Sequence, residues 1–226
     1  MNASKTLSES FRDIGKKYGY DSVAAEFCGF KEFKVKWTRS CGWAEFCVSD
    51  YVNNAPYEVM AGLAETIFLR ISKRTGKGYP QEMLNWITSD DFVREKQPVY
   101  MSRSRNLTRS AVGEHADLNE SYERLIDAGL AEYNSQLAIS WTKRPNIRRV
   151  GTCSVLMKVI SISSALDDPS VPAFVYDYVL YHELIHSAKG FDPFGQRHGN
   201  DFRVLEHLHP MHREAEEWLG KMRLHI

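Results

Sequence analysis

The stretch Val179-Leu-Tyr-His-Glu-Leu-Ile-His186 places two histidines four residues apart in a pattern that predicts a helix. The helix is expected to begin near Pro172, since proline suits a first helical turn, and to end at Gly190. A step of four residues on a helix rises about 6 Å and returns to nearly the same face. The side chains of His182 and His186 are therefore expected to point at one common position.

Two imidazoles that converge in this way are typical zinc ligands, with bond lengths of about 2.0–2.1 Å. Glu183 stands at the edge of the same helix face, displaced too far to be a natural third ligand. It can still reach a metal-bound water, whose pKa zinc lowers to about 7, and take its proton during attack on a carbonyl. The order H-E-x-x-H thus predicts two zinc ligands and a general base. The alternative is a pair of surface histidines near a helix C-terminus, where histidine is favoured.

A catalytic zinc site needs a third protein ligand and one open position. His198 is the leading candidate, because it follows His186 by twelve residues and the glycines and proline between them allow the chain to turn back. Glu206 is the main alternative, since a glutamate on a following helix is another way to complete a zinc site. Three more histidines are expected to be solvated around a helix end, or in one case to contact substrate: His207, His209 and His212.

The histidines are unevenly distributed, because seven of the eight lie at or after position 182. This clustering indicates that the chemistry belongs to the C-terminal part of the chain. The 226 residues include 29 basic and 29 acidic ones, and a net charge of zero does not support a general polyanion-binding surface. A hydrophobic content of 43% excludes disorder as the dominant state.

The remaining patterns predict an α+β protein with small mixed sheets. Ahead of the H-E-x-x-H helix, a helix is expected at 118–129 and strands at 137–141, 150–156 and 158–163. Earlier in the chain, helices are expected at 5–30, 56–71 and 83–87, and strands at 33–37 and 43–48. An irregular segment is expected at 97–116, and helices at 202–208 and 213–224.

The two halves of the chain share a short similarity. The block Val35-Lys-Trp-Thr-Arg39 resembles Ile139-Ser-Trp-Thr-Lys143, and each precedes further strand-like sequence, a proline and a helix. The pattern is compatible with an N-terminal α/β half, residues 1–116, that is a degenerate copy of the catalytic region, residues 117–226, or that regulates it. Chance similarity is the alternative. The absence of a linker predicts one integrated α+β unit with two lobes.

These residues resemble the SprT-like zinc metallopeptidases, which include the Spartan-type DNA–protein crosslink proteases and the YgjP-like proteins. The resemblance is carried by Val179–His186 followed by His198-Gly-x-x-Phe202, and it covers about residues 137–209. It implies a zincin-like core, in which a small mixed sheet packs on the active-site helix. It also implies that His182, His186 and His198 hold zinc and that Glu183 is the general base. The archaeal minigluzincins share this core but complete the site with a glutamate, which keeps Glu206 as the alternative.

The resemblance further implies a protein or peptide substrate, with DNA-associated substrates among those possible in the family. Relatives often carry a cysteine-rich zinc ribbon or tails for DNA recruitment, and neither is expected here, so a DNA-repair role is not expected to transfer. In zincins of this kind, an edge strand near the active-site helix receives the substrate as an added strand. Lys158–Ser163 is the candidate strand, with an ordinary core strand as the alternative.

The cysteines and the apolar segments bear on location. None of the four cysteines forms a C-x-x-C pair, which argues against a zinc ribbon, and free thiols are expected at Cys28, Cys41, Cys47 and Cys153. No run of 18 apolar residues predicts a membrane span, and the first ten residues lack the apolar centre of a signal peptide. A cytoplasmic location is expected.

Together these patterns predict a zinc-dependent metallopeptidase that hydrolyses peptide bonds with Glu183 as general base. One alternative keeps the metal but changes the substrate to a nucleotide or another non-peptide ester. A second alternative is a non-catalytic zinc- or DNA-binding module, which would need a saturated metal site and has no use for a base at Glu183. The sequence carries no signal for an oligomeric state.

Overall fold

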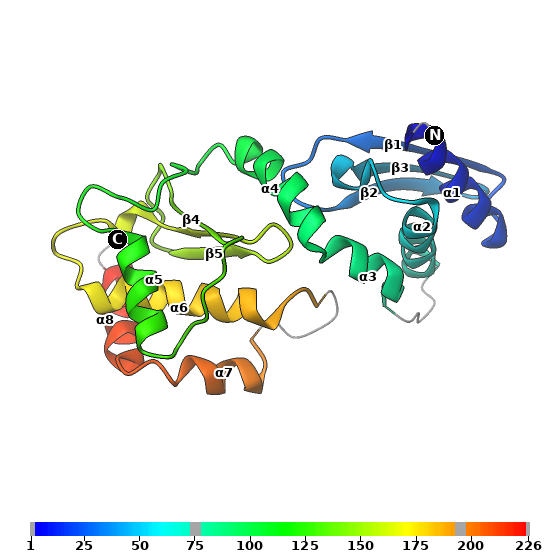
Figure 1. Cartoon of the computed structure of the whole chain (residues 1–226). Coiled ribbons are helices and arrows are strands. Elements are labelled where there is room, and N and C mark those ends of the chain that lie inside the picture. Colours follow the sequence, from blue (N-terminus) through cyan, green and yellow to red (C-terminus); the bar gives the residue numbers. More distant parts are fainter. Residues whose placement is uncertain (1–2, 73–77, 193–197, 225–226) are drawn as a thin grey trace. The chain divides into compact units, whose positions relative to one another are not determined.

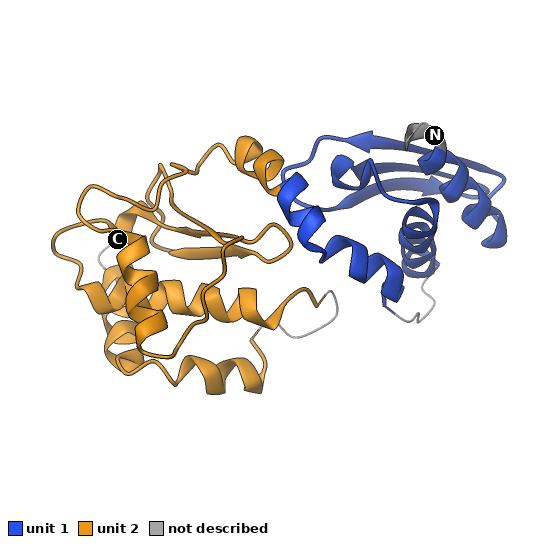
Figure 2. Cartoon of the chain, viewed as in Figure 1, with its two compact units in different colours: residues 1–96 blue, residues 97–226 orange. Residues whose placement is uncertain are grey.

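The computed structural model describes residues 3–72, 78–192 and 198–224, and it divides the chain into two compact units (Figures 1 and 2). Unit 1 comprises residues 1–96 and unit 2 comprises residues 97–226. Each unit combines helices with one three-stranded sheet, which makes the chain an α+β protein. The sequence placed the division between residues 116 and 117, whereas the units meet between Lys96 and Gln97, inside a helix.

Unit 1 has two helices on one face of its sheet. Strand β1 (Ser22–Cys28) pairs in parallel with β3 (Trp43–Ser49), which pairs antiparallel with β2 (Val35–Ser40). The ring of Phe46 on β3 packs against Phe11 of α1 (Ala3–Lys17) and Phe68 of α2 (Tyr57–Ile71). The ring centroids are 4.9 and 5.1 Å apart, respectively. The remaining elements are the short helix η1 (Asp50–Val52), α3 (Gln81–Ile87) and α4 (Asp90–Arg103), which continues into unit 2.

Unit 2 holds the H-E-x-x-H helix. Strand β4 (Ala138–Trp141) pairs in parallel with β6 (Val159–Ile162), which pairs antiparallel with β5 (Gly151–Ser154). The helical elements are α5 (Leu118–Asp127), the short helix η2 (Ser164–Leu166), α6 (Ala173–Lys189), α7 (Asn200–Glu206) and α8 (His212–Leu224). Its core joins the sheet to α5, α6, α7 and α8 through fully buried side chains such as Leu118, Ile160, Val175 and Phe202.

The two sheets have the same topology. In both, the first strand is parallel to the third, the second is antiparallel to it, and the third lies in the middle. In both, a helix precedes the sheet, and a short 3-10 helix and a capping proline, Pro56 or Pro172, lead to the long helix that follows. The sequence similarity does not follow this correspondence, because Trp37 lies in the second strand of its sheet whereas Trp141 lies in the first.

Most predicted elements are confirmed, including the hairpin of β2 and β3, the helices that follow Pro56 and Pro172, and the three strands before α6. Two predictions are wrong. Residues 22–28 form β1 rather than the end of a helix, because the chain turns at Gly19, whose φ is +81°, and then pairs with the distant β3. Residues 97–103 continue α4 despite Pro98, and the side chain of Gln97 donates to the carbonyls of Gln136, Met157 and Lys158.

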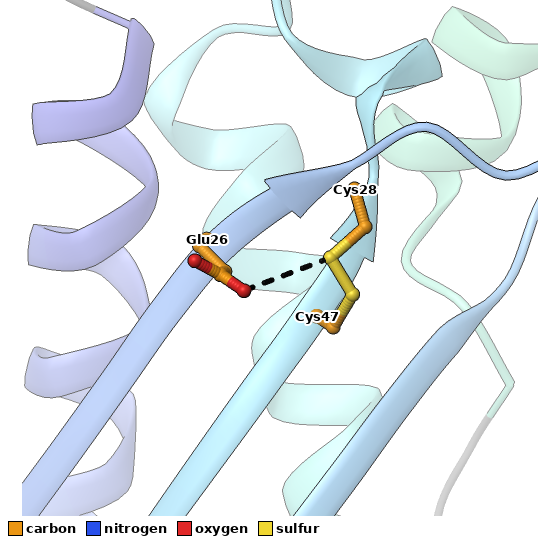
Figure 3. The surroundings of a disulfide bond; sticks show 3 residues. All are labelled: Glu26, Cys28 and Cys47. Atoms are coloured by element: carbon orange, nitrogen blue, oxygen red, sulfur yellow. Dashed lines mark hydrogen bonds between the residues drawn. A yellow bond between two sulfur atoms is a disulfide. The ribbon is translucent and has the colours of Figure 1, made fainter.

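The expectation of four free thiols is wrong for two cysteines. Cys28 and Cys47 form a disulfide that joins the parallel strands β1 and β3 (Figure 3). Their Cα atoms lie 5.6 Å apart, in the usual range for disulfides, because the strand pairing brings residues 19 positions apart next to one another. Cys41 and Cys153 are free.

No helix in the described part of the chain is long and apolar enough to span a membrane.

Candidate metal centre

Helix α6 presents the predicted zinc ligands from a firmly packed element. It begins after Pro172 and ends at Gly190, whose φ of +75° suits glycine. Side chains on its inner side, among them Val175 and Leu180, are fully buried in the core of unit 2. His182 and His186 are left half-buried, so their rings are held by the helix but remain accessible.

The three histidines predicted as ligands meet in the structure. One nitrogen from each of His182, His186 and His198 lies within 4.8 Å of those of the other two. The ring centroids are 4.8–5.2 Å apart, and His186 Nε2 lies 3.0 Å from His198 Nε2. His198 stands just before α7, whose N-cap is Gly199, so the return of the chain into α7 brings this ring back to α6.

The ring of Phe202 packs against all three histidines of the cluster. Its ring is fully buried, and its centroid lies 5.0, 4.5 and 4.8 Å from those of His182, His186 and His198. Because Phe202 belongs to α7 and the first two histidines to α6, it couples the packing of the two helices to the positions of the rings. The sequence included Phe202 in a motif but assigned it no role, although its spacing from His198 was a usable signal.

Glu206, the alternative third ligand, contacts a histidine instead of joining the cluster. Its Oε1 lies 2.7 Å from Nδ1 of His182, an atom other than the Nε2 that a metal could use. Burial alone would raise the pKa of Glu206, but hydrogen bonds from His182 and Tyr178 hold it below its ordinary value. The contact favours the His182 tautomer with a proton on Nδ1, which leaves Nε2 as a lone-pair donor.

A second layer of polar and aromatic groups supports Glu206. The hydroxyl of Tyr178 lies 3.0 Å from Glu206 Oε1 and 2.9 Å from Glu216 Oε1. Burial and these two carboxylates raise the pKa of Tyr178, so its hydroxyl stays protonated and is available as a donor. The Tyr178 ring also packs edge-on against His209 and His212.

The histidines after α7 do not all fit their prediction. His209 is buried rather than solvated, with 5% of its surface exposed, and packs against Tyr178 and Tyr181. Burial lowers its pKa, which keeps this ring neutral in the core. His207 and His212 are less buried and pack against each other with centroids 4.5 Å apart. None of the three belongs to the cluster of ligand atoms formed among the described residues.

Glu183 extends from α6 toward strand β5 of the sheet. Only 6% of its surface is exposed, and burial raises its pKa to about 8, although Arg149 acts in the opposite sense. Its carboxylate reaches strand β5, where the absence of a side chain at Gly151 leaves room for it. Cys153 on the same strand is affected too, since burial and the neighbouring Glu183 raise its thiol pKa to about 12. This inert thiol is consistent with its expected role as a small buried residue.

The helix position of Glu183 has an apolar counterpart in unit 1. Counted from the first helical residues, Tyr57 and Ala173, Ile67 and Glu183 are both the eleventh residue of their helices. Both are buried, Ile67 with 3% and Glu183 with 6% of its surface exposed. Unit 2 therefore places a carboxylate at a position that the same topology fills with hydrocarbon in unit 1, which is unfavourable for stability.

The predicted substrate strand is wrong. Lys158–Ser163 contains β6, and β6 is the central strand, hydrogen-bonded on both sides by β4 and β5. A central strand has no free backbone edge to which a peptide could add. In the described part of the chain, β5 is an edge strand of this sheet, and it packs against α6. The sequence identified the strands but not their order in the sheet.

No family model, curated protein or solved structure matches this chain.

Proposed function

We propose that this chain is a zinc-dependent metallopeptidase of the SprT-like type, with a zincin-like core in unit 2. The observation that carries the proposal is the convergence of ring nitrogens from His182, His186 and His198, two of them on the helix that also holds Glu183. A cluster of three imidazoles matches the donor set of known catalytic zinc sites, which leave one position open.

The residues present fit a zinc ion. Two imidazole nitrogens on one tetrahedral zinc lie about 3.3 Å apart, given bond lengths of about 2.0–2.1 Å. The separation of His186 Nε2 and His198 Nε2 is 3.0 Å, close to that value. The contact of Glu206 with His182 Nδ1 adds the carboxylate–histidine pair that commonly orients a zinc ligand. The donor set therefore favours His198, rather than Glu206, as the third ligand.

When bound, zinc would polarise the scissile carbonyl and lower the pKa of a bound water to about 7. The role of Glu183 is to move a proton. Its carboxylate would take the proton from the attacking water and later give it to the departing amine. Burial raises the pKa of Glu183 to about 8 in the metal-free protein, and the positive charge of a bound zinc would favour the carboxylate form that accepts the proton.

Two features support a polypeptide substrate. Among the described strands, β5 lies at an edge of its sheet and contacts Glu183 through Gly151, so an extended peptide would add to it as a further strand. Exposed apolar side chains also follow the third histidine, on or just after α7: Val204, Leu205 and Leu208. Exposed apolar groups of this kind suit unfolded or extended segments of other proteins rather than nucleotides.

We also propose that the two units are copies of one ancestral unit, of which unit 1 lost, or never gained, the histidines. The support is the shared strand order, strand directions, 3-10 helix and capping proline, together with the equivalence of Ile67 and Glu183. Arg70 stands at the position equivalent to His186, so α2 cannot offer the same pair of imidazoles.

The proposal is tested by zinc analysis combined with turnover of unfolded protein substrates. We expect one zinc per chain in the wild type, loss of zinc in His198→Ala, and retention in Glu206→Ala at saturating zinc. Glu183→Gln is expected to keep zinc and lose peptide cleavage. A panel of nucleotides and simple esters, run beside the protein substrates, separates the peptidase from another metal-dependent hydrolase.

Three outcomes would contradict the proposal in different ways. Cleavage of nucleotides without cleavage of proteins would show that the substrate is not a polypeptide. Full activity in Glu183→Gln would rule out Glu183 as the general base. A protein that holds no zinc after reconstitution would rule out a zinc enzyme and favour a binding module.

A further inference from the structure

The outer face of the unit 1 sheet carries a second group of metal-binding side chains, which the proposed peptidase does not use. Helices α1 and α2 cover the inner face, where Phe46 is buried. On the other face, Glu26 of β1 lies directly beside Cys47 of β3, and Cys28 follows two residues after Glu26 on the same side (Figure 3). Glu26 is exposed and both cysteines are half-buried, so this group is accessible within its unit.

The donor atoms of this group are close together. One carboxylate oxygen of Glu26 and the two sulfur atoms all lie within 4.8 Å of one another. Cys28 Sγ lies 3.9 Å from Glu26 Oε1, a distance at which a Cys28 thiol would donate to the carboxylate. Two thiolates and a carboxylate are all accepted ligands of zinc, with sulfur preferred by thiophilic cations.

A lysine on the neighbouring strand lies in the same row of residues. Lys36 of β2 lies opposite Cys47 in the antiparallel pairing, so Glu26, Cys47 and Lys36 form one row across the three strands. The ammonium nitrogen of Lys36 lies 5.4 Å from the centroid of the Phe30 ring. The row therefore places an acidic residue on one strand beside Cys47 and a basic residue on the other.

We propose that, when the Cys28–Cys47 disulfide is reduced, Cys28, Cys47 and Glu26 bind a thiophilic divalent cation of the zinc class, and that the disulfide closes the same site. Two small-molecule thiols would supply the two electrons and two protons that convert the disulfide to two thiols, and would themselves form one disulfide. Metal binding then releases the two thiol protons to solvent. In the reverse direction the small-molecule disulfide accepts two electrons and, with two protons from solvent, returns to two thiols, while the Cys28–Cys47 bond re-forms and the ion is released.

The fold accommodates both states without rearranging the core. Strands β1 and β3 stay paired from Ser22 to Cys28 by backbone hydrogen bonds that do not depend on the sulfur atoms. The buried apolar residues of β3, namely Ala44, Phe46 and Val48, alternate with Cys47 along the strand and face the helices. With three protein ligands on an open face, the remaining position would be filled by water, so exchange of the ion should be fast.

The test uses the full chain and Cd²⁺ as the probe, because cadmium bound to thiolate gives an ultraviolet charge-transfer band that histidine ligands do not give. The protein is reduced with a phosphine, freed of reductant without air, and titrated beside the oxidised protein. We expect a band that saturates at one Cd²⁺ per chain in the reduced protein and no band in the oxidised protein. Zn²⁺ added afterwards should abolish the band by displacing cadmium.

Variants define the ligands. Cys28→Ser and Cys47→Ser should each lose the saturable band, and Glu26→Gln should keep it but raise the dissociation constant about tenfold. Cys41→Ser is the matched control, since this exposed thiol lies on the turn between β2 and β3, and it should change nothing. The redox comparison on the wild-type chain needs no variant and stands even if a cysteine variant folds poorly.

The proposal is overturned if the reduced wild type shows no saturable band, or if the band persists in both cysteine variants. An unchanged affinity in Glu26→Gln would overturn the three-ligand site. None of these outcomes depends on the histidine cluster of unit 2. If that cluster did not bind zinc, the oxidised protein would contain no zinc, which is a separate measurement.

Discussion

A Cβ atom at position 151 would lie 2.5 Å from Glu183 Oε1 and 3.0 Å from Glu183 Cγ, so the carboxylate occupies the space that glycine leaves on strand β5. Real Cβ contacts at the shorter of these distances essentially never occur. The position of the proposed general base is therefore set by a residue on the sheet as well as by its own helix.

Gly151→Ala should displace the Glu183 carboxylate and leave the histidines in place. A misplacement of about 1 Å in a reacting group can cost roughly 100-fold in rate, so we expect a loss of turnover of that size with zinc content unchanged. Overpacking should also lower the free energy of unfolding by about 1–3 kcal/mol. Turnover assays, zinc analysis and denaturant unfolding of one preparation check all three.

The matched control is Gly220→Ala on helix α8. A Cβ there would meet nothing within 4 Å. Alanine in place of a helical glycine should stabilise the protein by about 0.5–1 kcal/mol and leave turnover unchanged. Equal activity in the two alanine variants would mean that Gly151 does not position Glu183.

Glu183→Gln should change how the stability of the zinc-free protein depends on pH. The pKa of Glu183 is raised from an ordinary 4.5 to about 8 by burial, so between these values the native state holds a proton that the unfolded state has lost. The wild type should therefore lose stability as pH rises from about 4.5 to about 8. Glutamine has no proton to lose, and the difference between the two unfolding curves should show this fall. Parallel curves would contradict a buried, protonated carboxyl group.

Glu206→Ala should weaken zinc binding without abolishing it. Loss of the partner at His182 Nδ1 typically costs about 10–100-fold in metal affinity, whereas loss of a ligand removes the site. Competition with a chelator measures the difference between Glu206→Ala and His198→Ala. Glu216→Gln is the control, since Glu216 contacts Tyr178 but not His182 in the structure. Complete loss of zinc in Glu206→Ala would instead identify Glu206 as a ligand.

Phe202→Ala should affect both folding and metal binding. The ring is fully buried beneath three histidines, and removal of a buried phenylalanine side chain costs about 3–5 kcal/mol. We expect weaker zinc binding as well, because the rings lose the surface that fixes their positions. Phe202→Leu should recover most of the stability but less of the affinity, and thermal unfolding with chelator competition separates the two effects.

Local patterns were sufficient to predict the histidine cluster from the sequence. The helical spacing of His182 and His186 follows from short-range geometry, and the structure brings the rings of His182, His186 and His198 together. The roles of Glu206 and Gly151 depend on contacts between distant segments, which no local pattern reveals. Strand order is also non-local, and this is why the central strand β6 was mistaken for an edge. The disulfide was missed for the same reason, since the parallel pairing of β1 with β3 places Glu26 beside Cys47 and so brings Cys28, two residues further on, within reach of it.

The equivalence of Ile67 and Glu183 bears on the heat resistance of the protein. Where one helix of this topology buries a hydrocarbon, the other buries a group that prefers water, so the proposed role of Glu183 as a base and the thermal stability of the unit make opposite demands at one residue. Evolution for higher temperature could relieve that conflict only by giving up the carboxylate or by reinforcing the rest of the unit. A descendant of this chain with an apolar residue at position 183 would thus be expected to unfold at a higher temperature than its parent.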